Sequence, residues 1–559
     1  MENIYNAIQN VYNMDKTTWQ EVLAELYNLV SKVENKFDTF ENKFGPLLGK
    51  EVTRELKKMY DNGSLSSLID DKLLKDIKTT VDDFKTEVSK QLDTIQNNRI
   101  VISNFPKIGN EIDDTNRIQR AINSLTTGGV LFFPYSNTGY KISSTITIPK
   151  SGICLLGDNA VIDMTKQNTN QNMFKIIDGD NSFIKGFILK CSDAKNGYDS
   201  KIECIKIIKA NNITIENIDF YNMLYSIKLD YNAETYVQNL TTNNLRSFGG
   251  AMFIHMTNLN GWNGSNLHSE LDFNSTTQFD HHYYIKCNVK DVQLNNVCCK
   301  NSNGGHAIQF NRYVGGVLDA PYGDETAKVE NFNVNGLLVE NCGSAVMFNS
   351  ECYEVSINNI TAKNLNRTDN GGKGVINFFQ GVYGNITING INARNVKCLF
   401  TVSNNTTNII DGLSISKSTI IGGCDNTTLY GAIKNLKISD LNIDNVRDNG
   451  TTLLFSFAGQ NYSNIKFDNF DLTITSTIKR TTDIIRFVTS GNYVFNNCSC
   501  RTTSENKSYA LILFSVYGGV SGVNARYNNI ELENINTLYN GKYDSVFKTN
   551  CIKDNVILP

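Results

Sequence analysis

The hydrophobic pattern of this chain is dominated by one short phrase that recurs along most of its length. The phrase is apolar-x-apolar-x, followed by Asn, Gly or Asp, and then by another apolar residue. It occurs at residues 213–218, 292–297, 332–337, 355–360, 386–391, 436–441, 465–470 and 530–535. Alternation with a period of two predicts a strand whose apolar residues share one face. Asn, Gly and Asp tolerate left-handed backbone, so we expect a bend at that position.

The spacing of the phrase predicts a solenoid. Strand–bend–strand units return every ~20–30 residues, which is the range typical of stacked repeats. The bend favours a parallel β-helix, an all-β fold, over a solenoid of alternating helices and strands. We expect the parallel β-helix to occupy residues 166–559, without a separate C-terminal domain.

Residues 1–97 follow a different pattern. Apolar residues recur with 4-3 spacing in two blocks: Val22, Leu26, Leu29, Val33, Phe37, Phe40 and Phe44, and then Ile77, Val81, Phe84, Val88, Leu92 and Ile95. This heptad stripe fits either an amphipathic helix on its own domain or a short oligomeric coiled coil. The narrow stripes, with β-branched and aromatic residues at the seam, favour the α-helical coiled coil.

The segment between these regions, 98–165, carries a specific motif. It reads Gly109-x3-Asp113-Asp114-Thr115-x2-Ile-Gln-x-Ala-Ile, then Gly128-Gly-x-Leu-x-Phe-Pro, then Tyr140-x-Ile. Asp-Asp-Thr is typical of a helix start, and Gly-Gly of a turn before a buried strand. In this order and spacing, the motif resembles the beginning of the pectate-lyase-like right-handed parallel β-helix found in phage tailspikes and pre-neck appendages.

The resemblance implies several properties. The fold would be a right-handed single-stranded parallel β-helix whose first rung is capped by the short helix within 98–165. The protein would be made in the bacterial host cytoplasm and located in the virion as a homotrimer. Residues 1–97 would face other tail or neck proteins. The calcium and arginine sites of the pectin-specific members have no match here, so pectate lyase activity is not implied and no cofactor is expected.

Composition excludes other classes of function. The net charge is −3, which provides no electrostatic footprint for nucleic acid. No stretch approaches the ~18 apolar residues of a membrane span, and the N-terminus carries no secretory signal pattern. The 13 cysteines lack a zinc-like CxxC pair, which favours reduced, buried thiols in a reducing cytoplasm.

Two regions interrupt the regular spacing, and we expect inserted loops there, near 257–289 and 313–328. All five histidines lie between His255 and His306. Histidine clustering suits acid/base chemistry near neutral pH. The sequence therefore places the candidate site beside these interruptions. The catalytic candidates are Glu351, Arg312, His282, Asp280 and His255, and the substrate-binding candidates are Trp262, Asn311, Asn349, Tyr313 and Gln309.

Alignment of successive second strands supports this choice. It places His255, Asn311 and Asn349 in one column with a spacing of ~4.8 Å, with Arg312 and Glu351 on adjacent rungs. Alternatives remain open. Arg312 and Glu351 fit an ordinary surface ion pair equally well, Asn columns are more often structural ladders, and the aromatic residues fit packing under a loop. Adjacent histidines point to opposite faces of a strand, so no metal site is predicted at Asp280-His281-His282.

Three functions fit these features. Paired carboxylates could hydrolyse a glycosidic bond, or Arg312 and a histidine could stabilise a cleaved phosphodiester. The same surface could bind a glycopolymer without cutting it, or the β-helix could be a spacer. The interruptions and histidines favour the first two functions over a spacer. Together with the resemblance, they lead us to expect a phage tail appendage that binds and depolymerises a host surface glycopolymer, with binding without cleavage as the alternative. Abundant Asn, Lys and Ile indicate a low-GC Gram-positive host, so wall teichoic acid or capsular polysaccharide is the expected polymer.

Overall fold

The computed structural model describes residues 99–229, 237–271, 281–286, 288–302, 304–311, 313–314, 317–318, 328–365, 374–404, 408–422, 427–446, 452–474, 482–502, 511–518, 520–541, 543–553 and 556–557. The predicted coiled coil of residues 1–97 lies outside the described residues. So do two catalytic candidates, Asp280 and Arg312.

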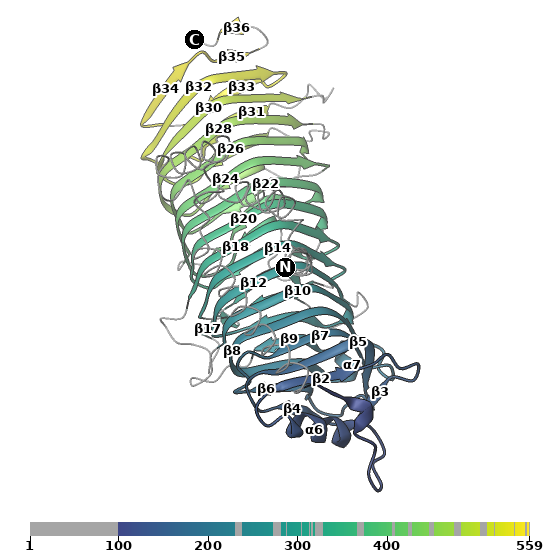
Figure 1. Ribbon diagram of the computed structural model, residues 1–559. Helices are drawn as coiled ribbons and strands as arrows, with labels where there is room; N and C mark the ends of the chain where they lie inside the picture. The colour runs from purple at the N-terminus through teal and green to yellow at the C-terminus, as the bar shows by residue number, and fades with distance from the viewer. Residues whose placement is uncertain are drawn as a thin grey trace, which may run out of the picture. The chain divides into compact units, whose positions relative to one another are not determined.

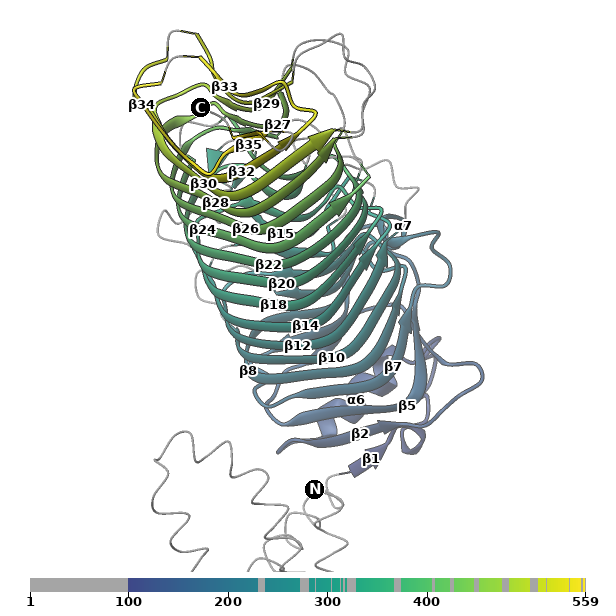
Figure 2. The same ribbon diagram turned by 90° about the horizontal axis from the view of Figure 1, so that it is seen from above.

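The described chain forms a parallel β-helix, which confirms the fold predicted from the repeat. Each rung contributes one long and one short strand, and equivalent strands of successive rungs pair in parallel. Figures 1 and 2 show the rungs stacked from the purple N-terminal end to the yellow C-terminal end. Backbone hydrogen bonds between the rungs therefore run along the axis of the stack.

The long strands form one continuous ladder, here called the long ladder. Its regular members are β5 (Ile153–Met164), β7 (Phe183–Lys190), β8 (Ile202–Tyr221), β10 (Val237–Gly250), β12 (Leu259–Leu271), β14 (Val289–Lys300), β18 (Val329–Glu340), β20 (Cys352–Leu365), β22 (Val382–Val396), β24 (Ile409–Ile421), β26 (Ala432–Val446), β28 (Gln460–Ile474), β30 (Gly491–Thr502) and β32 (Val523–Glu533).

The short strands form a second ladder, here called the short ladder, which the first part of β8 also joins. Its other members are β4 (Ile146–Ile148), β6 (Gln171–Ile177), β9 (Tyr225–Leu229), β11 (Met252–Met256), β13 (Tyr283–Ile285), β15 (His306–Asn311), β19 (Ser344–Asn349), β21 (Gly374–Phe378), β23 (Cys398–Val402), β25 (Thr427–Leu429), β27 (Thr452–Phe457), β29 (Thr482–Phe487), β31 (Leu511–Val516) and β33 (Thr537–Asn540).

The bend predicted within each phrase is present. Asn217, Asn296, Gly336, Asn359, Gly390, Asp440, Asn469 and Asn534 all have φ between 52° and 78°. Asn side chains at successive bends also join the rungs, as where Asn244 Nδ2 donates to Asn217 Oδ1 at 2.9 Å. The bends thus combine a backbone requirement with an amide ladder, and both favour Asn.

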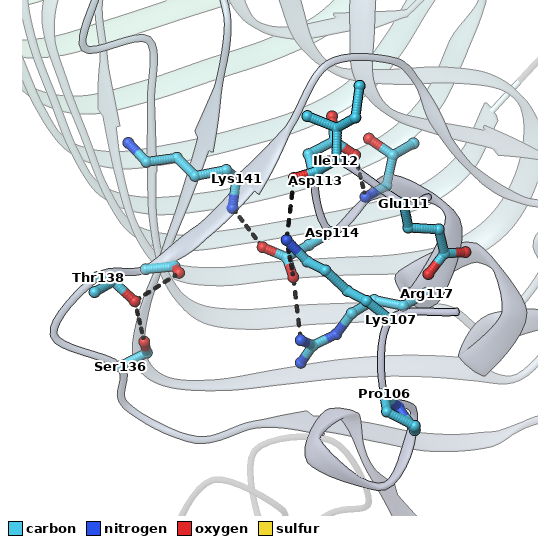
Figure 3. Close-up of polar contacts among 12 residues, drawn as sticks. Pro106, Lys107, Glu111, Ile112, Asp113, Asp114, Arg117, Ser136, Thr138 and Lys141 are labelled. Atoms are coloured by element: carbon cyan, nitrogen blue, oxygen red, sulfur yellow. Dashed lines mark hydrogen bonds and ion pairs between the residues drawn. The ribbon is translucent and has the colours of Figure 1, made fainter. Parts of the chain in front are cut away.

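The first rung is capped by α6 (Thr115–Ser124), as the Asp-Asp-Thr motif predicts. Ile118, Ala121 and Ile122 of α6 are buried against the end of the apolar core. The Asp114 carboxylate accepts a hydrogen bond from the Lys141 backbone at 2.8 Å and pairs with Arg117 at 3.1 Å (Figure 3). Asp114 therefore ties the start of the cap helix to β3 (Tyr140–Ile142).

Shorter elements complete both ends. β1 (Arg99–Val101), η1 (Ile102–Asn104) and β2 (Gly129–Phe133) precede the regular rungs, and α7 (Gly197–Ser200) lies before β8. At the C-terminal end, β34 (Ser545–Thr549) and β35 (Ile552–Lys553) pair with β32. β36 (Val556–Ile557) then turns back antiparallel to β35. Among the described residues, no helix is long and apolar enough to cross a membrane.

Within the interruption predicted at 257–289, the described residues 259–271 and 283–285 form regular strands instead of an inserted loop. β12 and β13 in this region pair with neighbouring strands on both sides. The phrase is hidden because Gly264 takes the place of its second apolar residue, beside the large apolar Trp262. A Cβ on Gly264 would lie 2.6 Å from the Leu294 side chain, so the Trp–Gly pair roughly conserves the core volume.

In the second predicted interruption, near 313–328, the structure describes two short strands and residue 328. β16 (Tyr313–Val314) and β17 (Val317–Leu318) form an antiparallel pair in a separate two-stranded sheet. The long ladder continues past them, because β14 pairs directly with β18.

Candidate functional site

A polar surface covers the outer side of the short ladder, opposite the apolar core. Its strands repeat the triplet apolar-x-apolar, and the middle residue points outward while its neighbours are buried. The middle residues stack in register and form what we call the second outer column: Lys175, Lys206, Lys228, His255, Tyr284, Gln309, Met347, Asn377 and Thr401.

A first outer column runs beside it, three residues earlier on each strand. Asn172, Glu203, Tyr225 and Met252 follow one another in register, and His306 is followed by Ser344. Contacts between the columns confirm that both face the same way. The Lys206 ammonium lies 3.4 Å from the Glu203 carboxylate, and the His281 ring stacks on Tyr284 at 5.3 Å.

Positive charge gathers at the N-terminal part of this surface. Glu203 is buried, and its carboxylate contacts Lys228 at 2.7 Å as well as Lys206. Lys286, also buried, lies with its ammonium 5.5 Å from the Tyr284 ring centroid. Lys206 and Lys228 thus contact the Glu203 carboxylate, and Lys286 and Lys228 both help to lower the pKa of His255. A cluster of ammonium groups can attract an anionic ligand.

The histidines and tyrosines form a continuous stack across the two columns. His255 lies between the rings of Tyr225 and Tyr284, at 5.7 and 5.4 Å, and His281 stacks on both Tyr284 and His306. The Ser344 hydroxyl lies 2.7 Å from His306 Nδ1. The three histidine rings are buried although they lie outside the apolar core of the β-helix, whereas Tyr225 and Tyr284 are partly exposed.

Burial holds these histidines in the neutral form. It lowers the pKa of His255 to about 3, with smaller contributions from Lys286 and Lys228, and it lowers the pKa of His306 to about 4. The pKa of His281 is lowered well below its usual value, first by burial and then by the neighbouring histidines. At neutral pH the imidazoles therefore offer hydrogen bonds rather than charge.

Two buried polar atoms of the second column have no hydrogen-bond partner in the described part of the chain. They are His255 Nδ1 and Gln309 Oε1, and the residues that carry them flank Tyr284 in register. An unpaired buried polar atom costs ~1–3 kcal/mol. A ligand that donates hydrogen bonds to these two atoms would remove that cost, so His255 and Gln309 are candidates for ligand contact.

The structure brings several predicted residues together, but not in the predicted register. Asn311 and Asn349 are neighbours, as expected, and Asn349 Nδ2 donates to Asn311 Oδ1 at 2.6 Å. His255 is not in their column, because it pairs with Tyr284, and Tyr284 pairs with Gln309. The prediction overlooked β13, which adds one rung. Asn311 Nδ2 nevertheless donates to the Tyr284 hydroxyl, so the residues share one surface.

Two predicted residues lie in the core. Trp262 is 1% exposed, packs near Tyr283, and donates from Nε1 to Thr242 Oγ1 at 2.9 Å. His282 is fully buried with Nε2 3.6 Å from Cys342 Sγ, and burial lowers its pKa to about 3. A polymer on the outer surface cannot reach either side chain in this arrangement, which removes both from the candidate site.

The remaining predicted residues lie at the edge of what the structure describes. Glu351 precedes β20 and is partly exposed, next to Lys328 and Tyr353, whose pKa values it helps to raise. Tyr313 is placed only as the first residue of β16. Among the described residues, no group of three or more His, Cys, Asp or Glu side chains is arranged to hold a metal ion.

The sequence prediction missed Glu203, Lys206, Lys228 and Lys286. A usable signal was present: Phe174-Lys-Ile, Ile205-Lys-Ile, Ile227-Lys-Leu and Ile254-His-Met are all apolar-x-apolar triplets of the short strands. Aligning the middle residues of these triplets would have produced the second outer column directly.

Burial of neutral histidines predicts a loss of stability in acid. In the unfolded chain the histidines have an ordinary pKa of about 6.5, which is higher than their pKa in the folded protein. As the pH falls, the unfolded state therefore binds more protons than the folded state. Stability should be complete above that pKa and should fall as pH drops towards 4 and then 3. Urea unfolding at pH 7.5 and at pH 4.5 measures this loss of stability as a lower urea midpoint at pH 4.5.

Replacement of one histidine checks the cause. His255→Gln should reduce the difference between the two urea midpoints, whereas His268→Gln, at a half-buried position, should reduce it less. Equal midpoints at the two pH values in the wild-type protein would contradict the prediction.

Comparison with solved structures finds phage proteins, a bacterial surface adhesin and a bacterial enzyme. Bacteriophage CBA120 tailspike protein 3 has a TM-score of 0.37 and 10% identity over 84% of this chain and 62% of its own. Pre-mature bacteriophage phi29 gene product 12 has a TM-score of 0.39 and 15% identity, covering 83% of this chain and 75% of its own. The Streptococcus pneumoniae surface adhesin PfbA has a TM-score of 0.33 and 12% identity over 80% of this chain and all of its own.

Two of these three proteins, the CBA120 tailspike and the phi29 gene product, are bacteriophage proteins. The chain spans less than two thirds of the CBA120 tailspike. All three TM-scores are below 0.5, so the likeness carries no argument about activity. No protein-family model and no curated protein matches the chain.

Proposed function

We propose that this protein is a phage tail appendage that binds an anionic host cell-surface glycopolymer on the outer side of the short ladder. Wall teichoic acid and acidic capsular polysaccharide are the polymers that we expect. Residues 1–97 would join a homotrimer to other tail or neck proteins. The observation that supports binding is the cluster of Lys206, Lys228 and Lys286 beside polar atoms of His255 and Gln309 that have no hydrogen-bond partner among the described residues.

The chemistry of the surface suits such a polymer. Ammonium groups attract phosphate or carboxylate, and their attraction is stronger where burial reduces screening by water. The imidazole nitrogen and amide oxygen accept hydrogen bonds, which sugar or polyol hydroxyls can donate. A repeating polymer supplies both kinds of group along its length, as the stacked columns do along the rod.

The described residues favour binding over cleavage. A general acid or base works best with a pKa near the working pH. The pKa of every histidine is lowered, to about 3 or 4 at His255, His282 and His306. Glu203 already contacts two lysines. Depolymerisation, which the sequence favoured, therefore has no specific support in these residues.

One experiment tests binding and cleavage together. Purified protein is titrated with glucosylated wall teichoic acid, an acidic capsular polysaccharide and neutral dextran by isothermal titration calorimetry. We expect saturable binding of an anionic polymer that weakens with added salt, and no binding of dextran. The length of the polymer is then measured by size-exclusion chromatography and should be unchanged.

Each result has a definite meaning. Shortened polymer would contradict binding without cleavage and would restore the depolymerase hypothesis. Failure to bind either anionic polymer, or equal binding of dextran, would contradict the proposed function.

A further inference from the structure

A second polar cluster lies on the same outer side of the short ladder, near its C-terminal end. We call Asp483, Arg486, Ser515 and Tyr517 the distal patch. Asp483 and Arg486 lie on β29, three residues apart, as Glu203 and Lys206 do on β8. Arg486 is in register with Ser515 of β31, and Tyr517 follows that strand. The distal patch therefore continues the two outer columns.

The side chains of the distal patch are held in a defined arrangement. Arg486 Nε donates to the Asp483 carboxylate at 2.8 Å, and Nη2 donates to the same oxygen at 2.5 Å. The guanidinium carbon lies 5.8 Å from the centroid of the Tyr517 ring. Tyr517 is nevertheless 58% exposed, an unusual position for a large aromatic side chain.

One atom of the distal patch is left unsatisfied. Ser515 is 6% exposed, and its buried hydroxyl oxygen has no hydrogen-bond partner in the described part of the chain. It stands beside Arg486 on the outer side of the ladder. Such a hydroxyl has the same unmet requirement as His255 Nδ1 and Gln309 Oε1 at the other end of the surface.

We propose that the distal patch is a second binding subsite that holds a sugar ring of the same polymer. The negative face of an aromatic ring attracts the C–H groups on one face of a sugar. The adjoining guanidinium and carboxylate can donate to and accept from neighbouring hydroxyls. The Ser515 hydroxyl supplies one more hydrogen bond. This inference rests on the proposed function, because it assigns the distal patch to the polymer bound near His255.

The separation of the two sites determines how the distal patch contributes. Eight successive strand pairings of the short ladder lead from β11 to β29. At ~4.8 Å per rung, this is a distance of roughly 38 Å. A long polymer can engage both sites and gains avidity, by about 10²- to 10⁴-fold for well-matched sites. A fragment too short to span them gains nothing.

The test compares polymer lengths. Glucosylated wall teichoic acid is used at full length and as size-fractionated fragments shorter than the separation, with affinities measured by calorimetry. Tyr517→Ala should weaken binding of the long polymer at least ~10-fold and leave the affinity for fragments that bind near His255 unchanged. For teichoic acid without its glucose, Tyr517→Ala should leave the affinity unchanged.

Two further variants separate binding from structure. Phe547→Ala is the matched control, since Phe547 is 60% exposed and lies 5.8 Å from Arg526 in the same kind of cation–π contact. It should leave affinity for the long polymer unchanged. Ser515→Ala removes an unsatisfied buried hydroxyl, so it should not lower the melting temperature but should weaken binding of the long polymer.

The failure of this inference differs from the failure of the proposed function. The wild-type protein could bind the long polymer while neither Tyr517→Ala nor Ser515→Ala weakens that binding. This result would contradict the distal subsite and leave the distal patch as a surface ion pair beside an aromatic ring. A wild-type protein that binds no anionic polymer would overturn the proposed function itself, and the distal subsite with it.

Discussion

Replacement of Lys228 and Lys286 together by methionine is expected to lower affinity for an anionic polymer at least ~100-fold. Hydrogen bonds to charged groups contribute about 1.5–3 kcal/mol each, and this change removes two such donors. Methionine keeps much of the length of the lysine side chain, so packing against Tyr225 and Tyr284 is largely preserved. Calorimetric titration with teichoic acid measures the effect.

Charge controls make the result specific. Lys290→Met removes an exposed lysine from β14, in the long ladder, and should leave affinity nearly unchanged. Glu203→Gln removes the carboxylate that contacts Lys206 and Lys228, and it should strengthen binding because the surface becomes more positive. Full affinity in the double lysine variant, or weaker binding after Glu203→Gln, would show that the cluster does not hold the anion.

Replacement of Phe348 by alanine is expected to lower the free energy of unfolding by about 3–5 kcal/mol. Phe348 is fully buried in the core of the short ladder, where its ring stacks between Phe310 and Phe378 at 5.0 and 4.8 Å. The Tyr383 ring also packs edge-on at 5.9 Å. The substitution leaves a cavity between rungs, and each rung is stabilised mainly by its neighbours.

Urea unfolding, followed by circular dichroism, measures this loss. Phe547→Ala is again the matched control, and at an exposed position it should change stability by no more than about 0.5 kcal/mol. Similar midpoints for the two variants would contradict the assignment of the aromatic stack as a main source of stability. Because contacts are local, limited proteolysis of Phe348→Ala should begin near rungs β15 to β21.

The sequence was sufficient for the architecture because the features that determine it are local. A residue that must adopt positive φ selects Asn, Gly or Asp, and this requirement is visible in one repeat without knowledge of its neighbours. The start of α6 was equally readable from Asp113, Asp114 and Thr115. For the column of Asn311 and Asn349, ligand contact and a structural ladder were both left open, and the structure shows the amide–amide hydrogen bond of a ladder between them.

The site was harder to predict because it depends on register between rungs. β13 has only three residues, Tyr283–Ile285, so its rung was overlooked and His255 was assigned to the wrong column. Trp262 was taken for a loop residue because Gly264 hides the apolar alternation of β12. The unpartnered atoms on His255, Gln309 and Ser515 depend on distances between rungs, and sequence spacing contains no such information.

The uneven pairing along the short ladder has a mechanical consequence. A force along the axis of the β-helix acts on every junction between neighbouring rungs, and the hydrogen bonds of one junction share that force. The junction with the fewest hydrogen bonds therefore breaks first. β23 and β25 are paired only through Val402 and Leu429, whereas the adjoining β24 and β26 match along most of their length. Under tension, rupture should begin on the short-ladder side at this junction, and the stack should hinge open there before the long ladder separates.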